Sequence, residues 1–243
     1  MQIRRLFEHQ DLVVASLLEA TVWGASDPIP PSLLSVFVHH GGLMLGAYSR
    51  DQLIGIALAF PARDGERVTY LHSHLLGVLP GFRGQGVGES LKRAQRDWAQ
   101  DEGFPYVGWT YDPLVAANAW FNLSVLGASV ASLKTNAYGR LTDALNRDRP
   151  THRFWVEWSL NPKTSAQTEG PVRMMLIPDD FQAMASSRPQ YARDLSDQWF
   201  ETAQSWWQDG WRIRGMERML DGVAYRWVAR DGEGVKPKGD ELF

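Results

Sequence analysis

Apolar and polar positions recur along this chain with two periods, which predict a mixture of strands and helices. Runs that are apolar or alternate every second residue predict strands at 2–6, 43–49, 52–59, 67–78, 105–111, 129–138 and 153–160. Apolar residues three and four apart predict helices at 8–21, 32–39 and 89–98. We expect Ser32 to cap the second helix and Asp112-Pro113 to open a further one. This order predicts an α/β fold built on a mixed sheet.

The C-terminal third has its own pattern. A polar segment at 161–170 predicts a linker, so we expect domains at 1–160 and 171–243. The second of these is an additional C-terminal α+β segment with a frayed end at 235–243. Its predicted elements are a strand at 172–177, helices at 179–185 and 193–208, and a hairpin of 212–218 and 223–229 around Asp221-Gly222. Trp199 and Trp206 share one helix face, which we expect to pack as core.

Composition narrows the function classes. A net charge of −3 lacks the basic excess of a general nucleic-acid-binding protein. The absence of cysteine excludes disulfides, thiolate metal sites and a cysteine nucleophile. No apolar run reaches the length of a membrane span, and the N-terminus has no apolar core of a signal peptide. We therefore expect a cytoplasmic protein with neither nucleic-acid nor membrane partners.

A glycine-rich turn joins the strand that ends near Val78 to the helix at 89–98. Gly84, Gly86 and Gly88 lack the Cβ atoms that would keep a phosphate from the backbone, and they permit the φ values of a tight turn. The helix that follows directs unpaired N–H groups and its positive dipole end toward the same place. The turn therefore predicts a binding site for a nucleotide-containing ligand.

The spacing of the glycines decides which ligand. A Walker loop would continue with Gly-Lys-Ser/Thr, and a dinucleotide fingerprint requires G-x-G-x-x-G; neither is present. The run Arg83-Gly84-Gln85-Gly86-Val87-Gly88 fits Arg/Gln-x-x-Gly-x-Gly/Ala and follows Val78-x-Pro80. It resembles the acyl-coenzyme-A signature of the GNAT acyltransferase superfamily. The runs at 112–122, 136–139 and 148–154 are similar to a poorly characterised bacterial branch of that superfamily.

This resemblance implies a fold and a ligand. The implied fold is a mixed, mostly antiparallel sheet flanked by helices, over about residues 1–160. The implied donor is acetyl-CoA or another acyl-CoA, held along a strand that splays from its neighbour. The expected coenzyme contacts are Leu76, Gly77, Val78, Arg83, Gly84, Gln85, Gly86, Val87, Gly88, Asn118 and Asn122.

The strand at 70–78 also carries the candidate bases. Alternation places Tyr70, His72, His74 and Leu76 on one face. His72 lies eleven residues before Arg83, where histone-acetylating relatives carry a glutamate base, and His74 is its rival. An imidazole with an ordinary pKa near 6.5 suits a base and predicts an acidic limb near that pH. A metal site formed by both histidines with His39-His40 lacks a further ligand, so we expect no metal.

The candidate acid departs from the superfamily pattern. The resemblance implies a tyrosine four residues before Gly127 that protonates the leaving thiolate, and Leu123 occupies that position. Tyr138, with Tyr111 as a second option, has the right chemistry to replace it. A thiol with a pKa of about 8.5 can also leave without assistance.

Together these features predict an N-acyltransferase that moves an acyl group to a small-molecule amine by direct attack in a ternary complex, and the resemblance implies that this group is acetyl. The alternative is a noncatalytic acyl-CoA-binding module, because the tyrosine is missing. We expect the aromatic tail to wall the acceptor site, and the pattern leaves open a homodimer formed through it.

Overall fold

The computed structural model describes residues 1–24, 28–66, 68–139, 149–161, 170–178, 181–220 and 222–229. These residues form two compact units. The first contains residues 1–110 and 155–161, and the second contains residues 111–139, 149–154 and those described from 170 onward. Most of the predicted linker (162–169), the hairpin residue Asp221 and the predicted frayed end (235–243) lie outside the described residues.

The first unit is a sheet with three helices. Its elements are β1 (Gln2–Arg5), α1 (His9–Trp23), α2 (Pro31–His39), β2 (Leu43–Ser49), β3 (Gln52–Arg63), β4 (Thr69–Val78), the 3₁₀ turn η1 (Pro80–Phe82), α3 (Val87–Asp101), β5 (Tyr106–Tyr111) except its last residue, and most of β7 (Arg153–Ser159). The strand order is β1-β2-β3-β4-β5-β7. Strands β1 to β4 pair antiparallel and β4 pairs parallel with β5, so the predicted mixed, mostly antiparallel sheet is confirmed.

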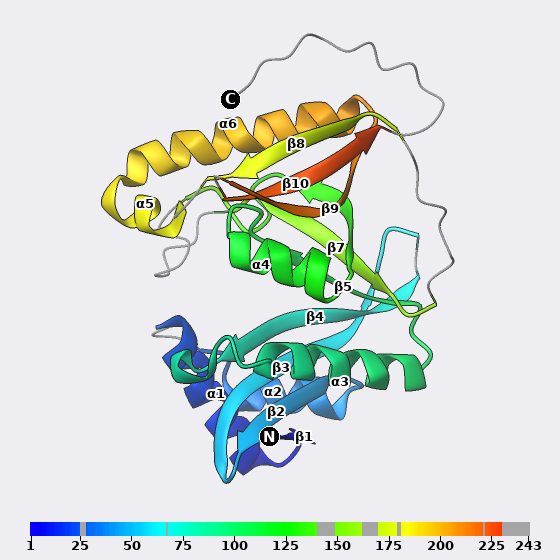
Figure 1. Cartoon of the computed structure of the whole chain (residues 1–243). Helices are drawn as coiled ribbons and strands as arrows, with labels where there is room; N and C mark the ends of the chain where they lie inside the picture. The colour runs from blue at the N-terminus through cyan, green and yellow to red at the C-terminus, as the bar shows by residue number, and fades with distance from the viewer. Residues whose placement is uncertain are drawn as a thin grey trace. The chain divides into compact units, whose positions relative to one another are not determined.

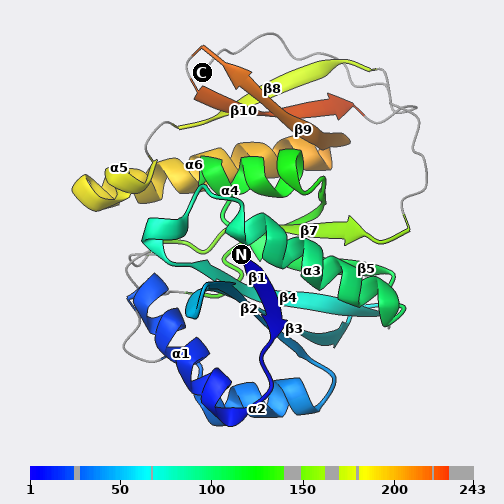
Figure 2. The same ribbon diagram turned by 60° about the horizontal axis from the view of Figure 1, so that its bottom comes forward.

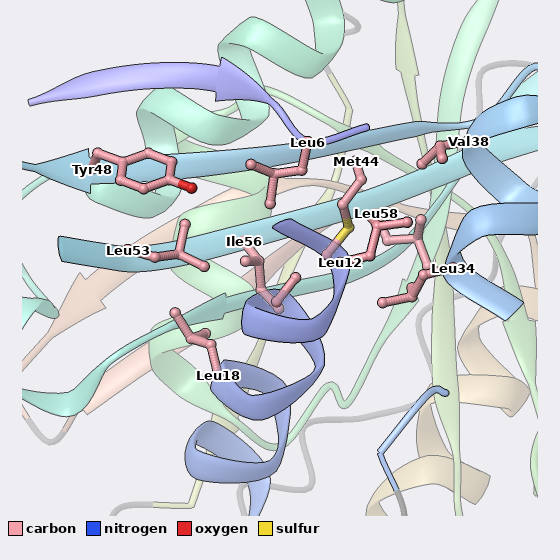
Figure 3. Close-up of a cluster of buried hydrophobic side chains, with 11 residues drawn as sticks. Leu6, Leu12, Leu18, Leu34, Val38, Met44, Tyr48, Leu53, Ile56 and Leu58 are labelled. Carbon is pink, nitrogen blue, oxygen red and sulfur yellow. The ribbon is translucent and has the colours of Figure 1, made fainter. Parts of the chain in front are cut away.

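Helices cover the two faces of this sheet (Figure 1). On one face, leucines of α1 and α2 pack against β2 and β3; Figure 3 shows this cluster, which includes Leu12, Leu18, Leu34, Met44, Ile56 and Leu58. On the other, Val87 and Leu91 of α3 pack against Ile54 and Ala57 of β3. We call these the α1–α2 face and the α3 face. Successive side chains of a strand point to opposite faces, so these strands contribute to both clusters, except where a bulge interrupts the alternation.

Two element boundaries differ from the prediction for local reasons. Helix α2 begins one residue earlier than predicted because Pro31 occupies its first position, where a missing N–H costs nothing; Pro30 is the N-cap, so the predicted Ser32 cap is wrong. Strand β3 continues to Arg63 through Pro61. Its pairing with β2 ends at Ala59, so Pro61 lies where β3 has a partner on one side only and proline is tolerated.

The second unit combines the C-terminal segment with residues that precede β7. Its elements are α4 (Ala116–Trp120), a π-helical turn η2 (Phe121–Val125), β6 (Ser129–Lys134), β8 (Val172–Ile177), α5 (Phe181–Ser187), α6 (Pro189–Gln208), β9 (Trp211–Met219) and β10 (Gly222–Ala229). Strands β8, β10 and β9 form a separate antiparallel sheet in that order, with α6 running beside it (Figure 2).

Aromatic side chains form the core of the second unit. Trp199 of α6 is buried and donates its Nε1–H to the carbonyl of Leu176, 2.8 Å away. Its ring also lies near those of Phe154 and Tyr225. The prediction that Trp199 packs as core is confirmed, and the C-terminal segment packs on residues 111–139 and 149–154 of its own chain. The compact units therefore divide near residue 110 and within β7, whereas the sequence placed a boundary at 160–170.

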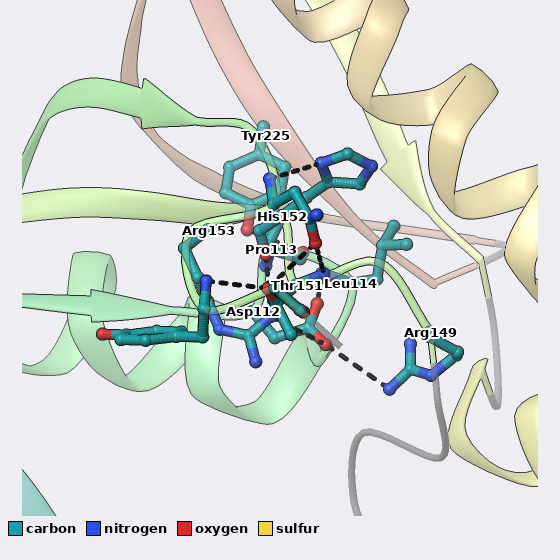
Figure 4. A network of polar contacts seen from close by, with 11 residues as sticks. Asp112, Pro113, Leu114, Arg149, Thr151, His152, Arg153 and Tyr225 are labelled. Carbon is teal, nitrogen blue, oxygen red and sulfur yellow. Dashed lines mark hydrogen bonds and ion pairs between the residues drawn. The ribbon is translucent and has the colours of Figure 1, made fainter. Parts of the chain in front are cut away.

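A polar network occupies the place where the sequence predicts a helix at Asp112-Pro113 (Figure 4). Asp112 Oδ1 accepts the N–H of Leu114, which makes a turn, and the regular helix α4 begins only at Ala116. Arg149 Nη2 and Arg153 Nη1 lie 3.6 and 3.9 Å from Asp112 Oδ2. Asp112 therefore serves as a turn residue and an ion-pair partner rather than as a helix cap.

Candidate functional site

Strand β4 has an edge that its neighbour leaves unpaired. β4 pairs with β3 along its whole length, from Thr69 to Val78. Its parallel pairing with β5 consists of only two positions, Leu71 opposite Val107 and His72 opposite Gly108. Among the described residues no strand pairs with this side of β4 beyond His72. We call the separation of the two strands after this point the β4–β5 fork.

The fork presents the backbone of Leu76 and Val78. The backbone N–H of Leu79 donates a hydrogen bond to the carbonyl of Ile54, so the N–H and C=O groups of Leu79 point toward β3. Because these groups alternate along an antiparallel strand, those of Leu76 and Val78 point away from β3. They are amide donors and acceptors on an open edge, which can bind the extended amides of a ligand as another strand would.

A β-bulge at His74 changes the face on which the following side chains lie. Leu58 is opposite Leu75 and Ala59 is opposite Ser73, so His74 has no opposite residue. Leu75 consequently packs on the α1–α2 face and Leu76 on the α3 face. The predicted common face of His72, His74 and Leu76 is therefore wrong at Leu76, because the extra residue reverses the alternation.

The loop after β4 has the backbone that an anion site requires. Gly84 and Gly86 have φ of +73° and +78°, in the left-handed region that favours glycine. A Cβ at either position would have no neighbour within 4 Å, so both glycines border open space. Gly86 is the N-cap of α3, whose first N–H groups have no partner within the helix. We call residues 83–88 the phosphate loop.

Two side chains tie the phosphate loop in place. Arg83 donates from Nε to the carbonyl of Val78 at 3.1 Å, and Gln85 donates from Nε2 to the carbonyl of Gly81 at 3.0 Å. Both side chains are exposed, and the loop follows the turn at Pro80–Phe82. Arg83 therefore keeps a fixed cationic group beside the loop's glycines, where it can pair with a phosphate.

The remaining predicted coenzyme contacts near the loop have distinct surroundings. Gly77 faces Trp23 of α1, and a Cβ there would lie 2.7 Å from the indole Cη2, so close ring packing requires this glycine. Val87 is buried on the α3 face, and Gly88 is the second residue of α3. The structure thus brings Leu76, Gly77, Val78 and residues 83–88 together on one continuous segment.

His72 lies on the α1–α2 face, on β4 where the fork begins. Its ring stacks on Trp155 at 5.9 Å and lies 5.1 Å from that of Phe60, which stacks on Phe37 of α2. Its Nδ1 is buried and has no hydrogen-bond partner among the described residues. Burial, followed by the charges of His74 and Lys92, lowers the pKa of His72 to about 4. The acidic limb expected near pH 6.5 is therefore replaced by one near pH 4 if His72 is the base.

His74 is the more exposed of the two histidines, and partial burial lowers its pKa as well. The two rings are 6.0 Å apart. Both are therefore predominantly neutral at neutral pH and can accept a hydrogen bond. Within the part of the chain that the structure describes, no set of three or more histidine, aspartate or glutamate side chains is arranged to hold a metal ion.

Comparison with known proteins gives a family for this geometry. Residues 13–123 match the model of the acetyltransferase (GNAT) family. Residues 13–123 therefore form a GNAT acetyltransferase domain. A comparison with curated protein sequences gives no significant match. Among the described helices, none has the length and apolar character that crossing a bilayer requires.

Solved structures of GNAT enzymes have the same fold. The ribosomal-protein-S18-alanine N-acetyltransferase of Escherichia coli has a TM-score of 0.54 at 17% identity, over 69% of this chain and 99% of that one. The ribosomal-protein-alanine N-acetyltransferase of Brucella melitensis gives 0.52 at 18%, over 65% and 99%. A GNAT family acetyltransferase from Elizabethkingia anophelis with acetyl-CoA bound gives 0.50 at 12%, over 65% and 97%. About a third of this chain lies outside each of these matches.

The other GNAT-derived candidates belong to the second unit. Asn118 is exposed on α4, and Asn122 is buried in η2. Leu123, at the predicted position of the tyrosine acid, follows Asn122 in η2. Tyr138 lies in a turn with its side chain 51% exposed, whereas Tyr111 is buried and hydrogen-bonded to the hydroxyl of Tyr225. Burial raises the pKa of Tyr111, which makes it a poor proton donor.

Sequence reasoning did not single out two residues beside the β4–β5 fork. Trp155 stacks on His72, and Lys92 reaches β4 from α3. A signal for Lys92 was present: Gly88, Lys92, Gln95 and Ala99 follow helical spacing, and the last three are buried. The strand pattern around Trp155 predicted burial but gave no partner.

Proposed function

We propose that this protein transfers an acyl group, acetyl being the simplest, from an acyl-CoA to the amine of a small molecule, by direct attack in a ternary complex. The observation that carries this proposal is the open edge of β4, which runs directly into the phosphate loop. A pantetheine arm and a pyrophosphate are joined in coenzyme A in the same order. The acetyltransferase family of residues 13–123 agrees with this reading.

The donor would bind to backbone groups and one cation. The pyrophosphate would lie at Gly84 and Gly86 and at the first N–H groups of α3, beside Arg83. The pantetheine amides would bond to the edge groups of Leu76 and Val78. Asn118 and Asn122 remain further candidates for coenzyme contacts.

The reaction requires removal of one proton and departure of a thiolate. The lone pair of the acceptor amine attacks the thioester carbon, the carbon–sulfur bond breaks, and the amine proton passes to a base. His72 is our first candidate, since its imidazole is neutral and lies on β4 where the fork begins, and His74 is the second. A thiolate whose conjugate acid has a pKa of about 8.5 can leave unassisted, or accept a proton from Tyr138.

The test is free-thiol release from acetyl-CoA in the presence of a panel of small-molecule amines. We expect thiol release that depends on the amine and on enzyme concentration, with acylated amine formed in equal amount. The variant Gly86→Asp, which places a negative side chain at the loop, should abolish it. Amine-dependent release unaffected by Gly86→Asp would contradict donor binding at the phosphate loop.

One observation favours a second function, a noncatalytic acyl-CoA-binding module. Leu123 occupies the position of the family's tyrosine acid, and a base with a pKa near 4 is a weak one. Such a module would bind acetyl-CoA by calorimetry yet release no thiol with any amine above the rate without protein. Both functions therefore predict binding of acetyl-CoA, and only the first predicts release of free thiol.

A further inference from the structure

Lys92 is a lysine that the fold places almost entirely out of solvent. It is the sixth residue of α3 and is 2% exposed. Its Nζ donates to Ser73 Oγ at 2.7 Å and lies 3.5 Å from Gln95 Oε1. The face of the Trp109 indole completes its surroundings, with Nζ 3.5 Å from the ring centroid. Lys92 therefore has polar partners, all of which are uncharged.

These partners locate Nζ at the β4–β5 fork. The last paired residues of the two strands are His72 and Gly108. Ser73 and Trp109 are the next residues on their respective strands, so Nζ contacts both strands one residue beyond their last pair. Helix α3 runs over this sheet beside β4 (Figure 1). Lys92 thus fills the base of the fork from the α3 face.

An amine in this place is costly for stability alone. Burial of an ammonium without a carboxylate carries a desolvation penalty of several kcal/mol, and no described carboxylate forms an ion pair with Nζ. Burial accordingly lowers the pKa of Lys92 well below its ordinary value of 10.5. An apolar side chain of the same length would fill the space without this penalty. A function that uses the position of the amine explains its presence better than packing does.

Lys92 also links the two halves of the proposed donor site. Helix α3 begins at the phosphate loop, and Lys92 lies five residues from its first residue, a rise of about 7.5 Å. The same helix therefore supplies the N–H groups proposed to bind the pyrophosphate at its N-terminus and contacts the fork through Lys92. Ser73, which Lys92 holds, directly precedes the bulge residue His74.

We propose that Lys92 is a positioning residue that fixes the β4–β5 fork relative to the phosphate loop, so that one acyl-CoA engages both at once. This inference rests on the proposed function, because it concerns the same donor. It assigns to Lys92 no contact with the reacting atoms. A fixed distance between loop and fork raises the affinity for the whole coenzyme, because pantetheine is at a high effective concentration near the fork once the pyrophosphate is bound at the loop.

The experiment compares whole coenzyme with its nucleotide half. Calorimetry measures binding of coenzyme A and of adenosine 3′-phosphate 5′-diphosphate, which lacks pantetheine, to the full chain and to Lys92→Met. We expect Lys92→Met to weaken coenzyme A binding at least tenfold and nucleotide binding less than twofold. Lys134→Met, an exposed lysine on β6, should change neither.

The variant Ser73→Ala removes the acceptor of the 2.7 Å bond and keeps the lysine, so it tests the proposal independently if Lys92→Met folds poorly. It should show the same selective loss, threefold or more. Equal affinity of both variants and wild type for coenzyme A, or an equal loss for both ligands, would overturn the positioning role. Failure of wild type to bind either ligand would instead overturn the proposed function.

Discussion

The Nε of Arg83 donates a hydrogen bond to the carbonyl oxygen of Val78, 3.1 Å away, so the first side chain of the phosphate loop is held against the end of the strand that precedes it. The two Nη groups have no hydrogen-bond partner among the described residues. A guanidinium held in this way is already oriented for phosphate oxygens, which lowers the entropic cost of binding.

Arg83→Lys keeps the charge and removes both the hydrogen bond to Val78 and the planar guanidinium group. We expect coenzyme A affinity to fall about tenfold, since hydrogen bonds to charged groups contribute about 1.5–3 kcal/mol. Arg83→Ala should cost more. Calorimetry at fixed ionic strength measures both, with Arg226→Lys on β10, outside the proposed site, as the control for the same exchange. Equal affinities for Arg83→Lys and wild type would show that only charge matters.

Gly86→Asp should lower coenzyme A affinity at least tenfold with the fold intact by circular dichroism. The change adds a negative charge and a side chain where the phosphates approach, and it strains a residue at φ +78°. Gly103 also has φ +78° and open space around it, beyond the other end of α3. Gly103→Asp therefore reproduces the strain alone, and we expect it to leave binding within twofold. An equal loss in both variants would attribute the effect to strain.

His72→Asn should lower kcat/KM roughly 10²-fold if His72 is the base. Because the pKa of His72 is lowered to about 4, the imidazole stays neutral and competent as the pH falls from 8 to 5.5. The ratio of wild-type to variant kcat/KM, which cancels ionisation of the acceptor amine, should therefore be constant over this range. With an unshifted pKa of about 6.5 the ratio would fall about tenfold at pH 5.5. The same ratio for His74→Asn identifies the base if His72→Asn has no effect.

Lys92 should make the stability of the protein rise with pH above neutrality. Its pKa is lowered in the folded state, so the unfolded chain binds the extra proton between that lowered pKa and about 10.4. Stability therefore increases with pH through this window and the increase ends near 10.4. Urea unfolding of wild type and Lys92→Met at several pH values measures it. The free energy of unfolding of wild type should rise relative to that of Lys92→Met as the pH increases, and a difference that stays constant would contradict a lowered pKa of Lys92.

Tyr225→Phe should destabilise the second unit by about 1–3 kcal/mol. The hydroxyl of Tyr225 donates to the carbonyl of Pro113 at 2.8 Å and accepts from Tyr111 at 3.2 Å. Its removal leaves both of these buried partners without a hydrogen bond. Thermal or urea unfolding measures the loss, and Tyr191→Phe, an exposed tyrosine on α6, is the matched control. A change within 0.5 kcal/mol, the range of ordinary surface substitutions, would show that water replaces the hydroxyl.

The sequence predicted most elements because their apolar spacing matches the faces that they bury. Strands Leu43–Ser49 and Val172–Ile177 have the predicted bounds, and α3 and α6 differ from their predictions only by a few residues at their ends. The turn of the phosphate loop was equally predictable, since the positive φ values of its backbone favour glycine at these positions. These features depend on residues close together in the chain.

Features that depend on distant partners were not predictable. The bulge at His74 is invisible in the strand, because Tyr70, His72, His74 and Leu76 alternate without interruption; only pairing with Leu58 and Ala59 reveals it. The lowered pKa of His72 arises from burial among rings of β3 and β7 that no local pattern places there. The sequence of α3 is largely polar, so Lys92 would be expected to face solvent until its partners on β4 and β5 are known.

The bulge at His74 also decides which changes in length this strand can accept. Ser73 faces α3 and Leu75 faces α1 and α2, as consecutive residues of a regular strand would, so deletion of His74 would join them and leave Leu75 to Val78 on their present faces. An added residue between Leu76 and Gly77 would instead turn Gly77 and Val78 to the opposite faces. The added side chain would also take the place of Gly77 beside Trp23, where a Cβ would lie 2.7 Å from the indole. The strand can therefore lose one residue at the bulge, but it cannot gain one beyond the bulge without rebuilding the side chains that follow.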